Sequence, residues 1–187
     1  MTGDHITNTT NFTVNPIDHI PTNVKLGYIP YTPEHENICS IGRPISVDLS
    51  KILPGKTIVL VAAPGAFTPT CTERHIPGFV SGYKQLKDNG ADEVYVLTTD
   101  NPFVQAAWGK ALGNKGEVKF VSDPKGAFSA ELGLASLEGD EYVSARTFRY
   151  AAVVIDGVVQ YLGVEHKGSL DRSTFPAVLR FLESAKL

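Results

Sequence analysis

Cysteine is scarce in this chain: its 187 residues contain only Cys39 and Cys71, and no CxxC motif. Two cysteines cannot build a disulfide framework or complete a cysteine-rich zinc site. The missing CxxC excludes the usual thioredoxin-type dithiol. His75 follows Cys71 by four residues, but two ligands do not make a metal site, so we expect His75 to bond locally and expect no metal or other cofactor. The two thiols could still form one redox pair.

The sequence also lacks a long apolar run, a basic excess and a leader segment. No run approaches the length of a membrane span, and a formal charge of -3 gives no footprint for nucleic acid. No basic, apolar-cored leader opens the chain, which argues against secretion and mitochondrial import. The chain ends in Ala185-Lys186-Leu187, one small residue different from the peroxisomal Ser-Lys-Leu signal, although an ordinary helix end is the alternative. We expect a cytoplasmic location, a peroxisomal one, or both.

The length of 187 residues, with 42% hydrophobic and 20% charged residues, suits one globular domain with a full core. Residues 1–23 are rich in Thr and Asn and are expected to form a flexible N-terminal arm. Residues 24–187 are expected to form a single domain.

Apolar runs over 57–63 and 93–99 predict two buried strands, and 24–29 and 118–121 predict two more. Ile45, Val47 and Leu49 alternate with polar residues, as in a half-buried strand. Asp156-Gly157 between two apolar runs predicts a β-hairpin. Helical spacing alternates with the early strands and the hairpin comes late, so we expect an α/β fold of the thioredoxin-like type, with a mixed central sheet flanked by helices.

The chain is organised around the stretch from 57 to 75, where an apolar strand is broken by Pro64-Gly65. Thr68 followed by Pro69 predicts a helix N-cap and first helical residue, which puts Cys71 in the first turn. Free backbone N–H groups and the positive end of the helix dipole lie there and favour a thiolate, the reactive form of cysteine. Pro77 predicts a kink or restart of the helix after Cys71.

Four blocks in this order resemble the peroxiredoxins, and among them the peroxiredoxin-five-like group, with fungal alkyl hydroperoxide reductases and peroxisomal thiol peroxidases the most similar. The blocks are residues 64–79 (PGAFTPTCTERHIPGF), 100–103 with 107–110, 122–128, and 149–157. A lone TxxC would be a weak signal, whereas four ordered blocks are a strong one. The resemblance covers residues 24–187 and implies reduction of hydrogen peroxide and organic hydroperoxides.

The resemblance makes Cys71 the peroxidatic nucleophile and matches Pro64, Thr68 and Arg149 to the other active-site positions. Thr68 can hydrogen-bond the thiolate and the bound peroxide, and Arg149 keeps its charge while it holds both. Pro64 has no N–H and can shield the sulfur. Arg146 is the rival for the position of Arg149, but the strand pattern after Arg149 favours the latter.

Cys39 is the candidate resolving cysteine, since it lies in a polar loop with glycine nearby. Many peroxiredoxins resolve with a cysteine that follows the peroxidatic one, and this chain has none there. An N-terminal resolving cysteine resembles the fungal subgroup, in which the disulfide commonly joins two subunits. The spacing leaves open whether Cys39 reaches Cys71 of its own chain or of a neighbour, and we favour an intersubunit bond within a homodimer.

We therefore expect a thiol peroxidase: the Cys71 sulfenate condenses with Cys39, and thioredoxin or a similar thiol reductant reduces the disulfide. The alternative from another class is a redox relay, in which oxidised Cys71 passes its oxidation to a client protein. An inactive thioredoxin-like interaction domain is disfavoured, because Thr68, Cys71 and Arg149 are all present.

Overall fold

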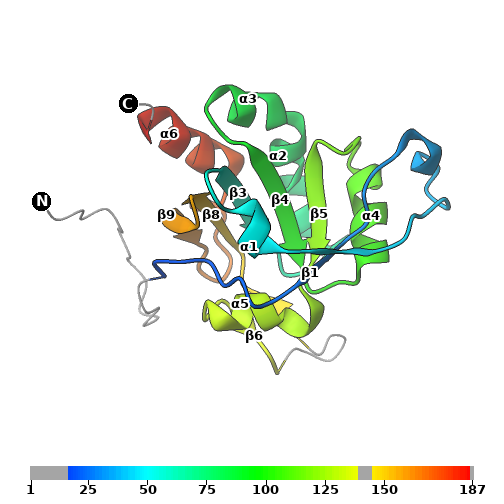
Figure 1. Cartoon of the computed structure of the whole chain (residues 1–187), viewed down its shortest axis with the longest axis horizontal. Coiled ribbons are helices and arrows are strands. Elements are labelled where there is room, and N and C mark those ends of the chain that lie inside the picture. Colours follow the sequence, from blue (N-terminus) through cyan, green and yellow to red (C-terminus); the bar gives the residue numbers. More distant parts are fainter. Residues whose placement is uncertain (1–16, 139–144, 186–187) are drawn as a thin grey trace, which may run out of the picture.

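A computed structural model describes residues 17–138 and 145–185. Its main feature is a seven-stranded mixed sheet with the strand order β2-β1-β5-β4-β3-β8-β9 (Figure 1). Strands β3, β4 and β5 are parallel, and the other neighbours in the sheet are antiparallel. The strands are β1 (Leu26–Tyr28), β2 (Ile45–Val47), β3 (Thr57–Ala62), β4 (Glu93–Thr98), β5 (Val118–Ser122), β8 (Tyr150–Ile155) and β9 (Val158–Val164).

Helices cover both faces of this sheet, so the central strands are apolar on both sides. In β3, Ile58 and Leu60 belong to one core cluster, while Val59 and Val61 belong to the other. Residues of α1 (Leu49–Ile52) and α5 (Ala127–Glu131) join the first cluster. The second is covered by α2 (Pro77–Ser81), α3 (Tyr83–Asp88), α4 (Pro102–Ala111) and α6 (Phe175–Ala185). The α/β fold of the thioredoxin-like type is confirmed.

Short elements fill the connections between the main strands and helices. They are the 3-10 helices η1 (Pro33–His35) and η3 (Pro124–Gly126), the π-helical turn η2 (Cys71–His75), and the paired strands β6 (Ala135–Ser136) and β7 (Arg146–Thr147). The predicted hairpin joins β8 to β9, and both of its turn residues have positive φ, 50° at Asp156 and 79° at Gly157. Such a turn matches the right-handed twist of the two strands.

The expected strand from Ile45 to Leu49 does begin at Ile45, but its half-buried face and its C-terminal end differ from the prediction. Ile45 is 51% exposed, and the strand stops at Val47. Leu49 starts α1 instead, because the Asp48 side chain accepts a hydrogen bond from the N–H of Ser50 and caps that helix. An aspartate between two apolar residues thus ended the strand that alternation alone predicted.

Composition predicts a flexible arm over residues 1–23, but residues 17–20 of it lie against the sheet. Ile20 is buried and its N–H donates to the carbonyl of Gly157, while the N–H of Val159 donates to the carbonyl of Asp18. This backbone pairing places the segment beside β9, upstream of the boundary expected at residue 23. Residues 1–16 lie outside the described part of the chain.

Candidate active site

The loop after β3 brings Cys71 to the start of a helix, as the sequence predicts. Helical structure begins at Pro69, and the N–H of Thr72 donates to the carbonyl of Thr68 over 2.9 Å. Cys71 is therefore the third helical residue. The loop is held by the segment that follows β4, because the N–H of Ala66 donates to the Asp100 carboxylate over 2.7 Å.

The turn that follows Cys71 is widened to a π-helix. The N–H of Ile76 donates to the carbonyl of Cys71 over 3.0 Å, one residue further back than in an α-helix. Pro77 then restarts the chain as α2, since proline has no N–H to continue the first helix. The predicted restart at Pro77 is confirmed. Single π-turns of this kind occur often at functional sites.

The thiol of Cys71 is only 1% exposed and has a cation beside it. The Nη1 of Arg149, immediately before β8, donates to the Cys71 Sγ over 3.4 Å. A guanidinium keeps its charge at any physiological pH, so a fixed positive charge lies beside this sulfur. Residues distant in sequence are therefore combined around one reactive atom.

Arg149 is itself held by His75. Its Nη1 donates to the His75 Nδ1 over 3.0 Å, and because arginine has no acceptor, Nδ1 carries no proton. The proton must then lie on Nε2, which donates to the carbonyl of Ser173 over 2.9 Å. Burial, together with the neighbouring Arg149 charge, lowers the pKa of His75 to about 4, so the ring is neutral near pH 7.

On the other side of His75, the series of hydrogen bonds continues through Ser173 to a carboxylate. The Ser173 hydroxyl donates to the Glu165 carboxylate over 2.9 Å, and Glu165 also accepts from the N–H of Ser173 over 2.6 Å. The N–H of Glu165 donates to the carbonyl of Arg149 over 2.9 Å. The network therefore returns to Arg149, whose backbone and side chain are both fixed by it.

Arg146, the rival for the cationic position, has a different place. Its Nη1 donates to the carbonyl of Pro64 over 3.0 Å. A Cβ on Gly65 would lie 2.8 Å from that Nη1, so a side chain at this position would displace the Arg146 guanidinium. Arg149, rather than Arg146, is the arginine that contacts the Cys71 thiol.

The Thr68 hydroxyl is turned toward its own loop. It donates to the carbonyl of Gly65 over 2.8 Å, and this use of its one proton leaves only its lone pairs for another partner. In this arrangement Thr68 cannot donate to the thiolate, in contrast to the role that the resemblance implies. Pro64 is half-buried beside the arginines and lines a cleft there together with Arg149.

The structure does not bring Cys39 to Cys71. Cys39 is exposed and Cys71 is buried, and both are free thiols. Cys39 lies in a turn closed by a hydrogen bond from the N–H of Ser40 to the carbonyl of Asn37. The ammonium of Lys110 in α4 donates to both of these residues' carbonyls and ties the turn to its own subunit.

Sequence reasoning missed the group that positions Arg149. His75 was expected to bond locally, yet its partners Arg149 and Ser173 lie 74 and 98 residues away. Ser173 and Glu165 carry no motif that would mark them. The signal available was the i,i+4 spacing of Cys71 and His75, which puts both on one face of a helix.

Among residues 17–138 and 145–185, no group of three His, Cys, Asp or Glu side chains is placed to hold a metal ion. Within the same residues, no helix has the length and apolar character needed to cross a membrane.

Comparison with known proteins decides the family. A family profile described as Redoxin matches residues 31–179. Peroxiredoxin AHP1 of Chaetomium thermophilum is 44% identical over 172 residues, which cover 90% of this chain and 95% of that protein. The chain belongs to the peroxiredoxin family. Peroxiredoxins are peroxidase oxidoreductases, so this peroxiredoxin is an enzyme.

Two further similarities agree with this assignment. A protein of Lipomyces kononenkoae, whose name describes a peroxisomal peroxiredoxin, is 48% identical over 152 residues, or 81% of this chain and 91% of that protein. The crystal structure of reduced Prx3 from Vibrio vulnificus in complex with H2O2 superimposes with a TM-score of 0.76 at 31% identity, covering 88% of this peroxiredoxin and 93% of that chain.

Replacing His75 with glutamine tests whether the ring is buried in its neutral form. The pKa of His75 is lowered from 6.5 to about 4 in the folded state, so the unfolded chain takes up a proton first as the pH falls through this range. The folded protein should therefore lose about 2 kcal/mol of unfolding free energy between pH 7 and pH 4.5 that His75→Gln does not lose. Urea unfolding of both proteins at the two pH values measures the difference.

His166→Gln is the matched control, because His166 is exposed. It should show the same pH dependence as the wild type. Parallel pH profiles for the wild type and His75→Gln would contradict the neutral, buried ring.

Proposed function

We propose that this peroxiredoxin reduces hydrogen peroxide and organic hydroperoxides at Cys71. One observation carries the proposal: the Arg149 Nη1 lies 3.4 Å from the Cys71 Sγ, at the start of a helix. Both the guanidinium and the helix N-terminus favour negative charge on the sulfur. The Vibrio vulnificus structure supports hydrogen peroxide as a substrate, since that protein is described in complex with H2O2.

The reaction follows from these positions. The Cys71 thiolate attacks the terminal oxygen of the peroxide, the O–O bond breaks, and water or an alcohol leaves after taking a proton from solvent. The sulfur becomes a sulfenic acid while the peroxide gains two electrons. Arg149 remains charged throughout and stabilises the negative charge on the departing oxygen. The Thr68 hydroxyl donates its proton to the Gly65 carbonyl, so its oxygen can accept a hydrogen bond from the peroxide O–H.

Cys39 is proposed to resolve the sulfenic acid, and thioredoxin or a similar thiol is proposed to reduce the resulting disulfide. An intersubunit disulfide is favoured because Lys110 holds the exposed Cys39 turn against its own chain, while Cys71 is buried. Two exposed aromatic side chains support a homodimer. Phe67 is 53% exposed just before the helix that begins at Pro69, and Phe103 is 48% exposed at the start of α4.

A peroxisomal location, beside or instead of a cytoplasmic one, is proposed from the final Ala185-Lys186-Leu187. The name of the Lipomyces kononenkoae relative supports it. Lys186 and Leu187 lie outside the described residues.

The relay alternative needs the same reactive thiol, and no contact in the described part of the site favours it over peroxide reduction.

Cys71→Ser should abolish peroxide consumption, because serine cannot supply the nucleophilic thiolate. Consumption of hydrogen peroxide with thioredoxin and its reductase measures this, and circular dichroism shows whether the variant is folded. Full activity in a folded Cys71→Ser protein would refute the assignment of the nucleophile.

Cys39→Ser should still complete one turnover and then stall with thioredoxin, because no disulfide can form. Pre-reduced protein should consume about one peroxide per subunit and leave a sulfenic acid detectable by mass spectrometry. Unchanged steady-state turnover would remove Cys39 from the cycle. Nonreducing electrophoresis of the oxidised wild type separates an intersubunit bond from an intrasubunit one.

Arg149→Gln should slow the first turnover about 100-fold, the typical loss when one charge-stabilising donor is removed from a reaction centre. Arg146→Gln should cost less, since Arg146 contacts the Pro64 carbonyl rather than the sulfur. Stopped-flow rates with hydrogen peroxide compare the two variants, with the exposed Arg180→Gln as the control. A larger loss in Arg146→Gln would reverse the two roles.

A further inference from the structure

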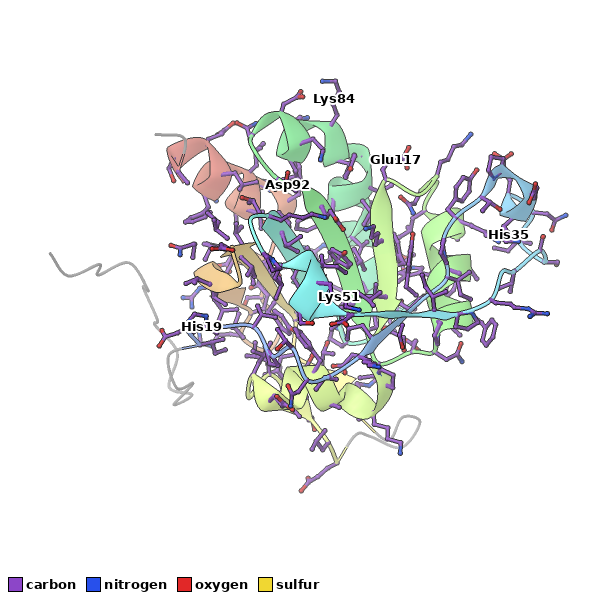
Figure 2. All side chains as sticks on the ribbon, viewed as in Figure 1. His19, His35, Lys51, Lys84, Asp92 and Glu117 are labelled. Atoms are coloured by element: carbon purple, nitrogen blue, oxygen red, sulfur yellow. The ribbon has the colours of Figure 1, made fainter. Side chains whose placement is uncertain are left out.

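The segment that carries Cys39 is a loop whose two ends meet. It leads from η1 toward β2, and a Cβ on Gly42 would lie 2.8 Å from the Cε1 of His35, so these two residues pack against each other. Figure 2 shows His35 on η1 near the edge of the molecule. Compact surface loops with closed ends are frequently functional. Cys39 lies midway along this loop and is exposed.

Short-range hydrogen bonds give the tip of this loop its shape. The N–H of Ser40 donates to the carbonyl of Asn37 over 2.9 Å, and the N–H of Cys39 donates to the Asn37 side-chain oxygen over 2.8 Å. An asparagine that accepts in this way forms an Asx turn. Ile38 and Ile41 on either side of Cys39 are 50% and 40% exposed, so these apolar side chains anchor the tip only in part. The local hydrogen bonds define the turn but do not join it to the rest of the fold.

Lys110 of α4 joins both ends of the turn to the fold. Its ammonium donates to the carbonyl of Asn37 over 3.2 Å and also to the carbonyl of Ser40. Lys110 is half-buried, and hydrogen bonds from a charged donor are stronger than those between neutral groups. Cys39 lies between the two residues that this one ammonium holds, so Lys110 restricts the position of the Cys39 backbone.

The helix that carries Lys110 is in turn held by the core. Trp108 is fully buried, and its Nε1 donates to the Thr72 hydroxyl in η2 over 3.1 Å. A Cβ on Gly109 would lie 2.9 Å from the Phe120 ring, so α4 packs closely on β5 at this point. Because α4 is fixed against both η2 and β5, it gives the turn a rigid base.

We infer that Lys110 is a positioning residue for the resolving step, because it holds the Cys39 turn ready to react with a Cys71 sulfenic acid. The inference rests on the proposed role of Cys39 as the resolving cysteine. Cys39 is already exposed, so the turn does not have to open before its thiol can react. A turn that is ordered in advance loses less conformational freedom when it meets its target, and this raises the rate of the step.

The resolving step exchanges an S–O bond for an S–S bond. The Cys39 thiolate attacks the sulfenic sulfur of Cys71, and the leaving hydroxide takes up the proton released by Cys39 to become water. The Cys39 sulfur is oxidised and the Cys71 sulfur is reduced by the same amount, so the step needs no outside oxidant.

A second molecule of peroxide competes with this step. It transfers an oxygen atom to the sulfenic acid, which becomes a sulfinic acid, while the peroxide is reduced by two electrons to water. Slower resolution by Cys39 therefore raises the share of Cys71 that ends as sulfinic acid.

Lys110→Met tests the inference, because methionine keeps most of the apolar stem and removes the donor. Pre-reduced full-length protein is mixed with one equivalent of hydrogen peroxide, quenched in acid at successive times, and analysed by mass spectrometry. Formation of the Cys71 sulfenic acid should keep the wild-type rate, because Lys110 does not contact that sulfur. Formation of the Cys39–Cys71 disulfide should slow about tenfold, the factor expected when one hydrogen bond from a charged donor is lost.

The same variant should lose resistance to excess peroxide. During turnover with thioredoxin, sulfinic acid at Cys71 should accumulate in Lys110→Met at about one tenth of the hydrogen peroxide concentration that the wild type needs, because the two reactions of the sulfenic acid compete. Mass spectrometry of the Cys71 peptide measures this product. Lys110→Arg keeps a charged donor at this position and should stay close to the wild type in both measurements.

Lys115→Met is the matched control, because Lys115 holds the same segment by a weaker contact. The Lys115 ammonium pairs with the Glu36 carboxylate over 3.3 Å, and the two side chains are 65% and 64% exposed. An ion pair exposed to this extent contributes little. With the same change in net charge, Lys115→Met should form the disulfide and resist peroxide as the wild type does. Circular dichroism shows whether each variant is folded.

A folded Lys110→Met protein that forms the disulfide at the wild-type rate, or faster, would overturn the inference. Equal slowing in Lys115→Met would also overturn it, since the change in net charge would then explain the result. The same holds for an equal loss in the first oxidation step, which indicates general damage to the site. The two proposals fail separately: absence of a Cys39–Cys71 disulfide in the oxidised wild type refutes the role of Cys39, whereas a disulfide that forms independently of Lys110 refutes only the role of Lys110.

Discussion

The contact between the Arg149 guanidinium and the Cys71 sulfur is the interaction on which the site depends. A helix start and a buried strand place a thiol, but they do so in many proteins without any peroxide chemistry. The added cation comes from the neighbouring strand, since Arg149 precedes Tyr150, which pairs with Ala62 at the end of β3, and it lies 78 residues later in the sequence. Arg149 is half-buried, and the neutral ring of His75 accepts a hydrogen bond from it, which holds the guanidinium in place without cancelling its charge.

The sequence predicted local features well where one chain segment determines them. Three features each follow from residues within one turn of them: the strand before Cys71, the helix start at Thr68 and Pro69, and the restart at Pro77. The wrong prediction at Leu49 also has a local cause. The alternation of apolar and polar residues suggests that the strand continues, but the Asp48 side chain caps a helix that starts at Leu49.

The group around Arg149 could not be predicted in the same way. The hydrogen bond from His75 to the Ser173 carbonyl depends on how the segment after β9 returns to the active-site helix, and a backbone acceptor leaves no trace in residue type. The orientation of the Thr68 hydroxyl is likewise decided by a carbonyl, that of Gly65, which turns toward it in the folded loop. Motif resemblance singled out Cys71 and Arg149, but the contacts that hold them depend on the three-dimensional fold.

The near-complete burial of Cys71 also restricts which oxidants can reach its sulfur, according to their size and shape. A sulfur that is 1% exposed can be reached by the two-oxygen tip of a peroxide, whereas a disulfide or a bulky electrophile has to bring its whole reactive centre into the fold. Cys39 has no such protection, so alkylating reagents and oxidised glutathione meet it first. One chain thus holds two thiols that meet different sets of reagents. Selectivity for peroxides is then a steric property of the folded protein as much as an electronic property of the sulfur.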